Sequence, residues 1–243
     1  MSLIQKLIIL FFYQFLFGGV INAQINYSEI SSVQRTNILD ESFESNTNNW
    51  ITDNSWIKGG FANSRYHVTC KNFNQNTGLS YITISLDQQK DFEIETSFSV
   101  IKGTGALVFG MTKNFDHYRF EINDKADFTI IKDTPSKNKV EKLFSGSVKA
   151  FTEPYLFNKF TIRKFNGLYY FFVNEFMICQ LKNIILSGNQ VGYSVGLNSA
   201  ISVDYLNVSY LQEKATLLLA EKESVIKDTS SAPLQINKVI VNI

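Results

Sequence analysis

The feature of this sequence that most constrains its fold is a series of apolar segments between residues 160 and 210 with almost nothing between them. Asn166-Gly167 separates the first two segments, and this pair is the strongest short signal for a two-residue hairpin turn. Further short turns are expected at Asn174-Glu175 and Asn198-Ser199. The spacing predicts an antiparallel meander and therefore an all-β fold, but it does not indicate a ligand.

Alternation of apolar and polar residues predicts more strands before this series. Asp91–Ile101 alternates cleanly, which is typical of an antiparallel strand with one buried and one polar face. His117–Ile122 alternates in the same way, with its aromatic and aliphatic residues expected inward and His117, Arg119 and Glu121 outward. Other predicted strands are Ile38–Phe43, Tyr66–Cys70, Leu79–Leu86 and Val140–Phe144.

The N-terminus has the pattern of a secretory signal peptide. Residues 3–20 are mostly apolar, a single basic residue, Lys6, precedes most of the run, and Ala23 offers a small residue at a cleavage point. The alternative is a retained membrane anchor, since the run is only just long enough to span a bilayer. The pattern predicts an exported protein, whether secreted, periplasmic or on the cell surface, with no membrane span after cleavage.

The rest of the chain has the length of one all-β domain. We expect a signal peptide at 1–23, a lead-in at 24–37, the domain at 38–211 and a tail at 212–243. The tail holds leucines among charges and is compatible with a short helix or another strand, and Leu234–Ile243 alternates weakly, as an edge strand would.

The net charge bears on which partners the protein can bind, and the cysteine content bears on whether it contains a disulfide. The net charge is +1 and no cluster of Lys and Arg is present, which argues against a nucleic-acid partner. Cys70 and Cys179 both lie in predicted strands, and export would permit a disulfide between them across the sandwich. The alternative is two small thiols in a domain that needs no covalent link.

The order of these segments resembles the concanavalin A-like lectin/glucanase superfamily in its laminin-G-like bacterial form. The segments that carry the resemblance are LDESF (39–43), DFEIETSFSVIKGTGALVFG (91–110), FDHYRFEIN (115–123), FTIRKFNGLYYFFVNEFMI (160–178) and VGYSVGLNSAISVDYLNVSY (191–210). The resemblance implies a jelly-roll sandwich of two curved antiparallel sheets. It also implies a protein that binds glycans or proteins, or one that hydrolyses polysaccharides.

One candidate for catalysis is a row of carboxylates on a single strand. Asp91, Glu93 and Glu95 are spaced two residues apart and so share a face of the strand. Retaining glucanases of this architecture carry Glu-x-Asp-x-(x)-Glu, with one Glu as nucleophile and the other as acid/base. The order here, Asp-x-Glu-x-Glu, departs from that pattern at two positions, and the alternative is a solvated strand face.

The candidates for ligand binding are aromatic and polar residues. Trp50, Trp56 and Tyr66 would stack on sugar rings if exposed, with His117 and Arg119 as polar contacts. The alternative for the aromatic residues is packing in the core.

No cofactor or metal site is predicted from the sequence. The two histidines after the leader, His67 and His117, show no spacing typical of zinc ligands. Asp124 and Asp127 flank a hairpin and could touch Ca²⁺, but the loop lacks the run of oxygen ligands that such a site needs.

The sequence therefore favours an exported, non-catalytic binding module. It would recognise a glycan, or a cell-surface or extracellular protein, through a sheet face or rim loops. The alternatives are a glycoside hydrolase that uses the carboxylate row, and a purely structural accessory domain.

Overall fold

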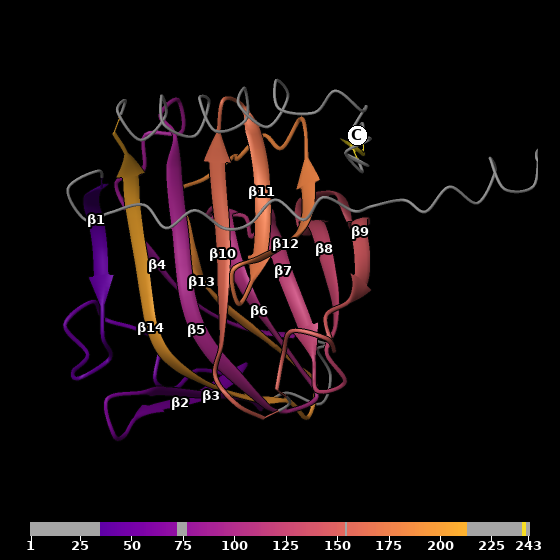
Figure 1. Ribbon diagram of the computed structural model, residues 1–243. Helices are drawn as coiled ribbons and strands as arrows, with labels where there is room; N and C mark the ends of the chain where they lie inside the picture. Colours follow the sequence, from indigo (N-terminus) through magenta and orange to yellow (C-terminus); the bar gives the residue numbers. More distant parts are fainter. Residues whose placement is uncertain (1–34, 72–76, 154, 213–239, 242–243) are drawn as a thin grey trace, which may run out of the picture.

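The computed structural model describes residues 35–71, 77–153, 155–212 and 240–241 (Figure 1). The predicted signal peptide and most of the predicted tail lie outside these residues. The first strand begins at Arg35, a few residues inside the predicted lead-in.

The described chain forms two sheets that pack face to face (Figure 1). The nine-stranded sheet contains β1 (Arg35–Glu41), β2 (Ile57–Phe61), β3 (Tyr66–Cys70), β5 (Phe92–Lys102), β10 (Asn158–Phe165), β11 (Leu168–Val173), β12 (Phe176–Leu181), β14 (Ala200–Leu211) and β15 (Ile240–Val241). The six-stranded sheet contains β4 (Thr77–Thr83), β6 (Thr104–Met111), β7 (His117–Asn123), β8 (Asp127–Thr134), β9 (Lys139–Ser147) and β13 (Gln190–Gly196). The all-β sandwich predicted from the sequence is confirmed.

The strand order shows how the chain is wound. The nine-stranded sheet runs β15-β12-β11-β10-β5-β14-β3-β2, with β1 beside the second half of β14, and the six-stranded sheet runs β4-β13-β6-β7-β8-β9. Pairing is antiparallel throughout, except that β15 runs parallel to β12. In Figure 1 the long strand β14 bends toward the lower end, where β2 and β3 extend the sheet. Among the described strands, β1 and β4 each have one edge without a partner strand, one in each sheet.

The hairpin between β10 and β11 forms as its turn residues predict. Asn166 and Gly167 both have positive φ, at 49° and 74°, which is the conformation that a two-residue turn between twisted strands requires. Asn174 and Glu175 adopt the same region between β11 and β12, with φ of 45° and 70°.

The predicted meander, however, is wrong after β12. β13 crosses to the six-stranded sheet, where it pairs with β4 and β6, and β14 returns to the nine-stranded sheet between β5 and β3. Short spacing along the chain predicts strands but not their partners, since consecutive strands can lie in opposite layers of a sandwich.

The core lies between the two sheets and is rich in aromatic residues. Phe98 from the nine-stranded sheet stacks on Phe160 with ring centroids 4.2 Å apart, and Phe120 from the six-stranded sheet packs edge-on against Phe160 at 5.4 Å. Phe120 is fully buried, as its alternation predicts. Tyr170 belongs instead to a separate cluster with Phe165 and Phe172, on the other side of the nine-stranded sheet.

The disulfide that export would permit between Cys70 and Cys179 does not form, and the alternative of two thiols describes the structure. Cys70 lies on β3 and Cys179 on β12 of the same sheet, with four strands between them. At roughly 4.8 Å per strand they are too far apart for the Cα separation of about 7 Å or less that a bridge needs. Both remain thiols.

The last described strand agrees with the edge strand expected in the tail, because Ile240 and Val241 pair with Gln180 and Leu181 of β12. Within the described ranges, no helix has the length and apolar character that crossing a bilayer requires.

Candidate functional site

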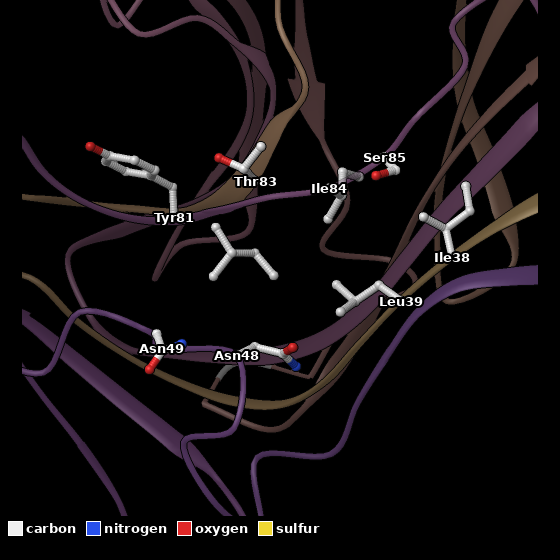
Figure 2. A pocket seen from close by; sticks show the side chains of 9 residues that line it. Ile38, Leu39, Asn48, Asn49, Tyr81, Thr83, Ile84 and Ser85 are labelled. Atoms are coloured by element: carbon white, nitrogen blue, oxygen red, sulfur yellow. The ribbon is translucent and has the colours of Figure 1, made fainter.

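A cleft opens at the edge of the sandwich, between β1 with its following loop and the edge strand β4 (Figure 2). We call it the edge cleft. Its volume is about 440 Å³, within the range of small-molecule sites. Figure 2 shows Tyr81, Thr83, Ile84 and Ser85 on one side and Ile38, Leu39, Asn48 and Asn49 on the other. Ile82 of β4 also lines the cleft. The lining residues thus include two amides, hydroxyls, an aromatic ring and aliphatic side chains, and none of them carries a formal charge. The side chains of Tyr81 and Thr83 leave β4 on the side away from Leu39 and Asn48 (Figure 2).

The loop that supplies Asn48 and Asn49 is held in place by the buried carboxylate of Glu41. Its oxygens accept hydrogen bonds from Trp50 Nε1 at 2.8 Å, from Asn48 Nδ2 at 2.6 Å and from the backbone N–H of Phe43 at 2.9 Å. Since Glu41 is the last residue of β1, the strand fixes the loop directly. The cleft wall is therefore built on a rigid element.

Trp50 is the apolar anchor of the same loop. Its side chain is 2% exposed and packs edge-on against Phe43, with ring centroids 5.4 Å apart. Asn46 brackets its backbone, because Asn46 Oδ1 accepts from the Trp50 N–H at 2.7 Å and Asn46 Nδ2 donates to the Trp50 carbonyl at 3.1 Å. Trp50 thus anchors the loop that forms one wall of the cleft and is not itself a lining residue.

Tyr66, another predicted ligand contact, is also in the core. It is fully buried, its hydroxyl donates to the Ile51 carbonyl and shares a hydrogen bond of 2.6 Å with Ser80 Oγ. Loss of solvation on burial raises the pKa of Tyr66 to about 12. Trp50 and Tyr66 therefore pack in the core, which was the alternative to their stacking on a sugar ring.

Trp56 differs from these two because it is half-buried and has half-buried aromatic neighbours. The ring of Phe115 stands nearly perpendicular both to Trp56, at 5.7 Å between centroids, and to Tyr81, at 6.1 Å. Asn54 Oδ1 accepts from the backbone N–H of Trp56 at 2.7 Å and fixes the start of this turn. We call Trp56, Tyr81 and Phe115 the aromatic cluster, and through Tyr81 it adjoins the edge cleft.

His117 and Arg119 lie together on β7, on the face of the six-stranded sheet opposite the core. They are 5% and 9% exposed, so both are more buried than their outward position predicts. The Arg119 guanidinium pairs with Glu121 at 3.2 Å and with Asp133 at 3.3 Å. His117 borders a second hollow of about 290 Å³, which we call the charged hollow.

The carboxylate row is held by cations and hydrogen-bond donors. Glu93 is 1% exposed and pairs with Arg163 at 2.5 Å and with Arg35 at 2.7 Å. Glu95 accepts from the Tyr205 hydroxyl at 3.0 Å. The row lies on the outer face of the nine-stranded sheet, across the sandwich from the charged hollow. The alternative of a solvated strand face does not hold at Glu93, because this side chain is buried.

Asp91, the first residue of the row, lies just before β5, and its Oδ1 accepts from the backbone N–H of Asn166 at 3.1 Å. Asp124, considered above for Ca²⁺, accepts from the backbone N–H of Gly103 at 2.9 Å. Among the described residues no group of three or more His, Cys, Asp and Glu side chains is placed to hold a metal ion.

Sequence reasoning missed Asn48, Asn49, Tyr81 and Phe115. The signal that could have found the first two is the polar run ESNTNN at 44–49, directly before Trp50. Tyr81 and Phe115 are 34 positions apart in the sequence, and only the pairing of β4, β13 and β6 brings them together.

Comparison with known proteins supports the architecture. No protein-family model matches this sequence, and no curated protein matches it. Among solved structures, carbohydrate-binding module CBM66 from Bacillus subtilis aligns with a TM-score of 0.51 at 13% identity, over 65% of this chain and 92% of that one.

Two further structures are similar to the same extent. The CBM2 module of the Lactobacillus casei BL23 phage J-1 evolved Dit aligns with a TM-score of 0.51 at 11% identity, over 74% of this chain and 97% of that one. Bacillus licheniformis β-glucanase aligns with a TM-score of 0.52 at 9% identity, over 75% of this chain and all of the other. The chain thus has the concanavalin A-like jelly-roll sandwich fold that the sequence resemblance implies.

Proposed function

We propose that this protein is an exported, non-catalytic glycan-binding module whose site is the edge cleft together with the aromatic cluster. The observation that carries the proposal is the position of Tyr81, which lines the cleft and contacts the half-buried ring of Phe115. The site lies on edge strands and a rim loop, one of the two locations that the sequence analysis favoured.

The chemistry of the lining matches an uncharged sugar. Amide groups of Asn48 and Asn49 and hydroxyls of Thr83 and Ser85 can both donate and accept, as sugar hydroxyls do. The aromatic cluster offers apolar faces to the C–H surfaces of a sugar ring. Because no lining residue of the edge cleft is charged, the cleft favours a neutral sugar over an anionic one.

Two independent considerations support a glycan-binding function and the export of the protein from the cell. Among the structural neighbours, one is described as a carbohydrate-binding module, one as a CBM2 module and one as a β-glucanase, all on the same fold. The N-terminal sequence pattern of a signal peptide favours export, which would place such a module among extracellular glycans.

Screening the purified protein on an array of neutral oligosaccharides tests the proposal. We expect binding, and we expect Tyr81→Ala to weaken it by about three- to tenfold, as loss of an aromatic contact does. Tyr155→Ala removes a tyrosine that is 65% exposed elsewhere and is the matched control.

Two results would overturn the proposal. One is an unchanged affinity of Tyr81→Ala for every bound glycan. The other is turnover of a polysaccharide that Glu93→Gln abolishes, which would establish the hydrolase alternative.

A further inference from the structure

The charged hollow is separate from the edge cleft and has different chemistry. It lies on the outer face of the six-stranded sheet, beside β7 and β8, with a volume of about 290 Å³. Its lining includes one histidine, three lysines and three carboxylates. What it can bind depends on which of these groups already have partners.

The buried imidazole of His117, a lining residue of the hollow, has one nitrogen without a hydrogen-bond partner among the described residues. Nδ1 lies 2.6 Å from the carbonyl oxygen of Phe115. A carbonyl oxygen only accepts, so Nδ1 carries the proton and, in the neutral ring, Nε2 keeps its lone pair. Nε2 is buried and has no hydrogen-bond partner within the described structure, although His117 lines the hollow.

The three carboxylates are already engaged. Asp116 accepts from the backbone N–H and the hydroxyl of Ser136, at 3.0 and 2.6 Å. Asp133 pairs with Arg119 at 3.3 Å. Glu141 pairs with Lys139 at 2.8 Å.

Two of the lysines are not engaged in this way. Neither Lys132 nor Lys137 forms an ion pair within 4.0 Å with any residue that the structure describes. The ammonium group of Lys132 lies 5.7 Å from the centroid of the Tyr118 ring, and Lys137 ends the exposed turn Pro135–Lys137. The hollow therefore offers two cationic donors beside one buried acceptor.

We propose that the charged hollow is a second sugar site, selective for a uronic acid, that is, a sugar ring that bears a carboxylate beside free hydroxyl groups. The carboxylate accepts from the ammonium groups of Lys132 and Lys137, and a ring hydroxyl donates to His117 Nε2. A simple anion would leave Nε2 without a donor. The charge of Lys137 acts on Asp116 and that of Lys132 on Glu141, but neither ammonium group is directly bonded to these carboxylates. A neutral sugar would give the two ammonium groups no charged acceptor, whereas a uronate carboxylate would.

The second site goes beyond the function proposed for the edge cleft and shares no lining residue with it. The two sites adjoin through Phe115, whose ring contacts Tyr81 and whose carbonyl accepts from His117. A glycan that contains both neutral and acidic sugars is thus the ligand that would occupy the two sites at once.

NMR titration of the whole protein with D-glucuronate and, separately, with D-glucose tests the inference, because the two differ only in the carboxylate. We expect the imidazole nitrogen signals of His117 to shift with glucuronate at concentrations where glucose has no effect. We expect Lys137→Gln and Lys132→Gln each to weaken glucuronate binding about tenfold, the loss of one charge-assisted hydrogen bond.

The controls separate this site from the edge cleft and from a simple anion site. Lys149→Gln, at an exposed lysine outside the hollow, should leave glucuronate binding unchanged, as should Tyr81→Ala. Sodium acetate should fail to compete at the same concentration. Equal shifts with glucose, equal competition by acetate, or full glucuronate affinity in both lysine variants would each overturn the inference, whatever the array shows for the edge cleft.

Discussion

Among the single residues, His117 shows how strongly burial can change a side chain that the sequence places on an outer face. Loss of solvation lowers the pKa of His117 below the ordinary value of 6.5, although the hydrogen bond to the Phe115 carbonyl opposes this. The charged groups near it are Asp116 and Asp133, which favour the protonated ring, and Arg119, which disfavours it. The ring is therefore neutral at pH 7.

This burial makes stability depend on pH. Between the folded and the unfolded pKa of His117 the unfolded chain binds more protons, so the free energy of unfolding falls as the pH falls. The contribution is fully present above about pH 6.5 and is lost toward the lower folded pKa. We expect the melting temperature to fall between about pH 7.5 and 5.5, and to fall less in His117→Gln.

Thermal melts at the two pH values measure this difference, with His67→Gln as the control for the other histidine. An equal fall in His117→Gln and in the unmodified protein would contradict the assignment of the effect to His117.

Among the elements, β1 and the loop that follows it carry the wall of the edge cleft. Glu41 closes the strand and accepts from three donors of the loop, those of Phe43, Asn48 and Trp50. The loop is therefore ordered by a buried carboxylate and an indole rather than by strand pairing. The same arrangement explains why a tryptophan that looks like a ligand contact in the sequence acts from beneath the site.

Removing this carboxylate should destabilise the fold and the cleft together. We expect Glu41→Ala to lower the free energy of unfolding by about 3 kcal/mol, because the buried indole N–H and the Phe43 N–H lose their acceptor. Glu44→Ala, three residues further along and exposed, should change it by about 0.5 kcal/mol or less.

Urea unfolding of both variants gives these values. A midpoint for Glu41→Ala equal to that of Glu44→Ala would show that the loop does not depend on Glu41.

For the whole molecule, a core rich in aromatic residues lies between the two sheets, and no disulfide joins the described strands. The two cysteines are on the same sheet and remain thiols, and burial raises the pKa of Cys179 well above its ordinary value. A domain of this size can bury enough apolar surface to fold without a bridge.

Alkylation tests this directly. We expect protein that is denatured without any reductant to take up two iodoacetamide labels, which mass spectrometry would detect. We also expect addition of reductant to leave the melting temperature of the native protein unchanged. An unlabelled denatured protein, or a melting temperature lowered by reductant, would show that the cysteines are bridged.

Local patterns predicted the strands and turns because the physics that fixes them is local. The alternation of β5 and β7 and the Asn166-Gly167 turn depend on side-chain period and on backbone φ, both of which a few neighbouring residues determine. The placement of β13 in the six-stranded sheet was not predictable in this way, since strand pairing depends on contacts between distant segments.

By itself, then, the sequence determined an all-β sandwich rich in buried aromatic residues, because the period of apolar residues is written directly in the chain. Only the tertiary structure decided which aromatics are buried and which form a surface. Trp50 and Trp56 are six positions apart, yet one is in the core and the other joins Tyr81 and Phe115 beside the edge cleft. Burial depends on what the rest of the fold places over a side chain, and no local pattern contains that information.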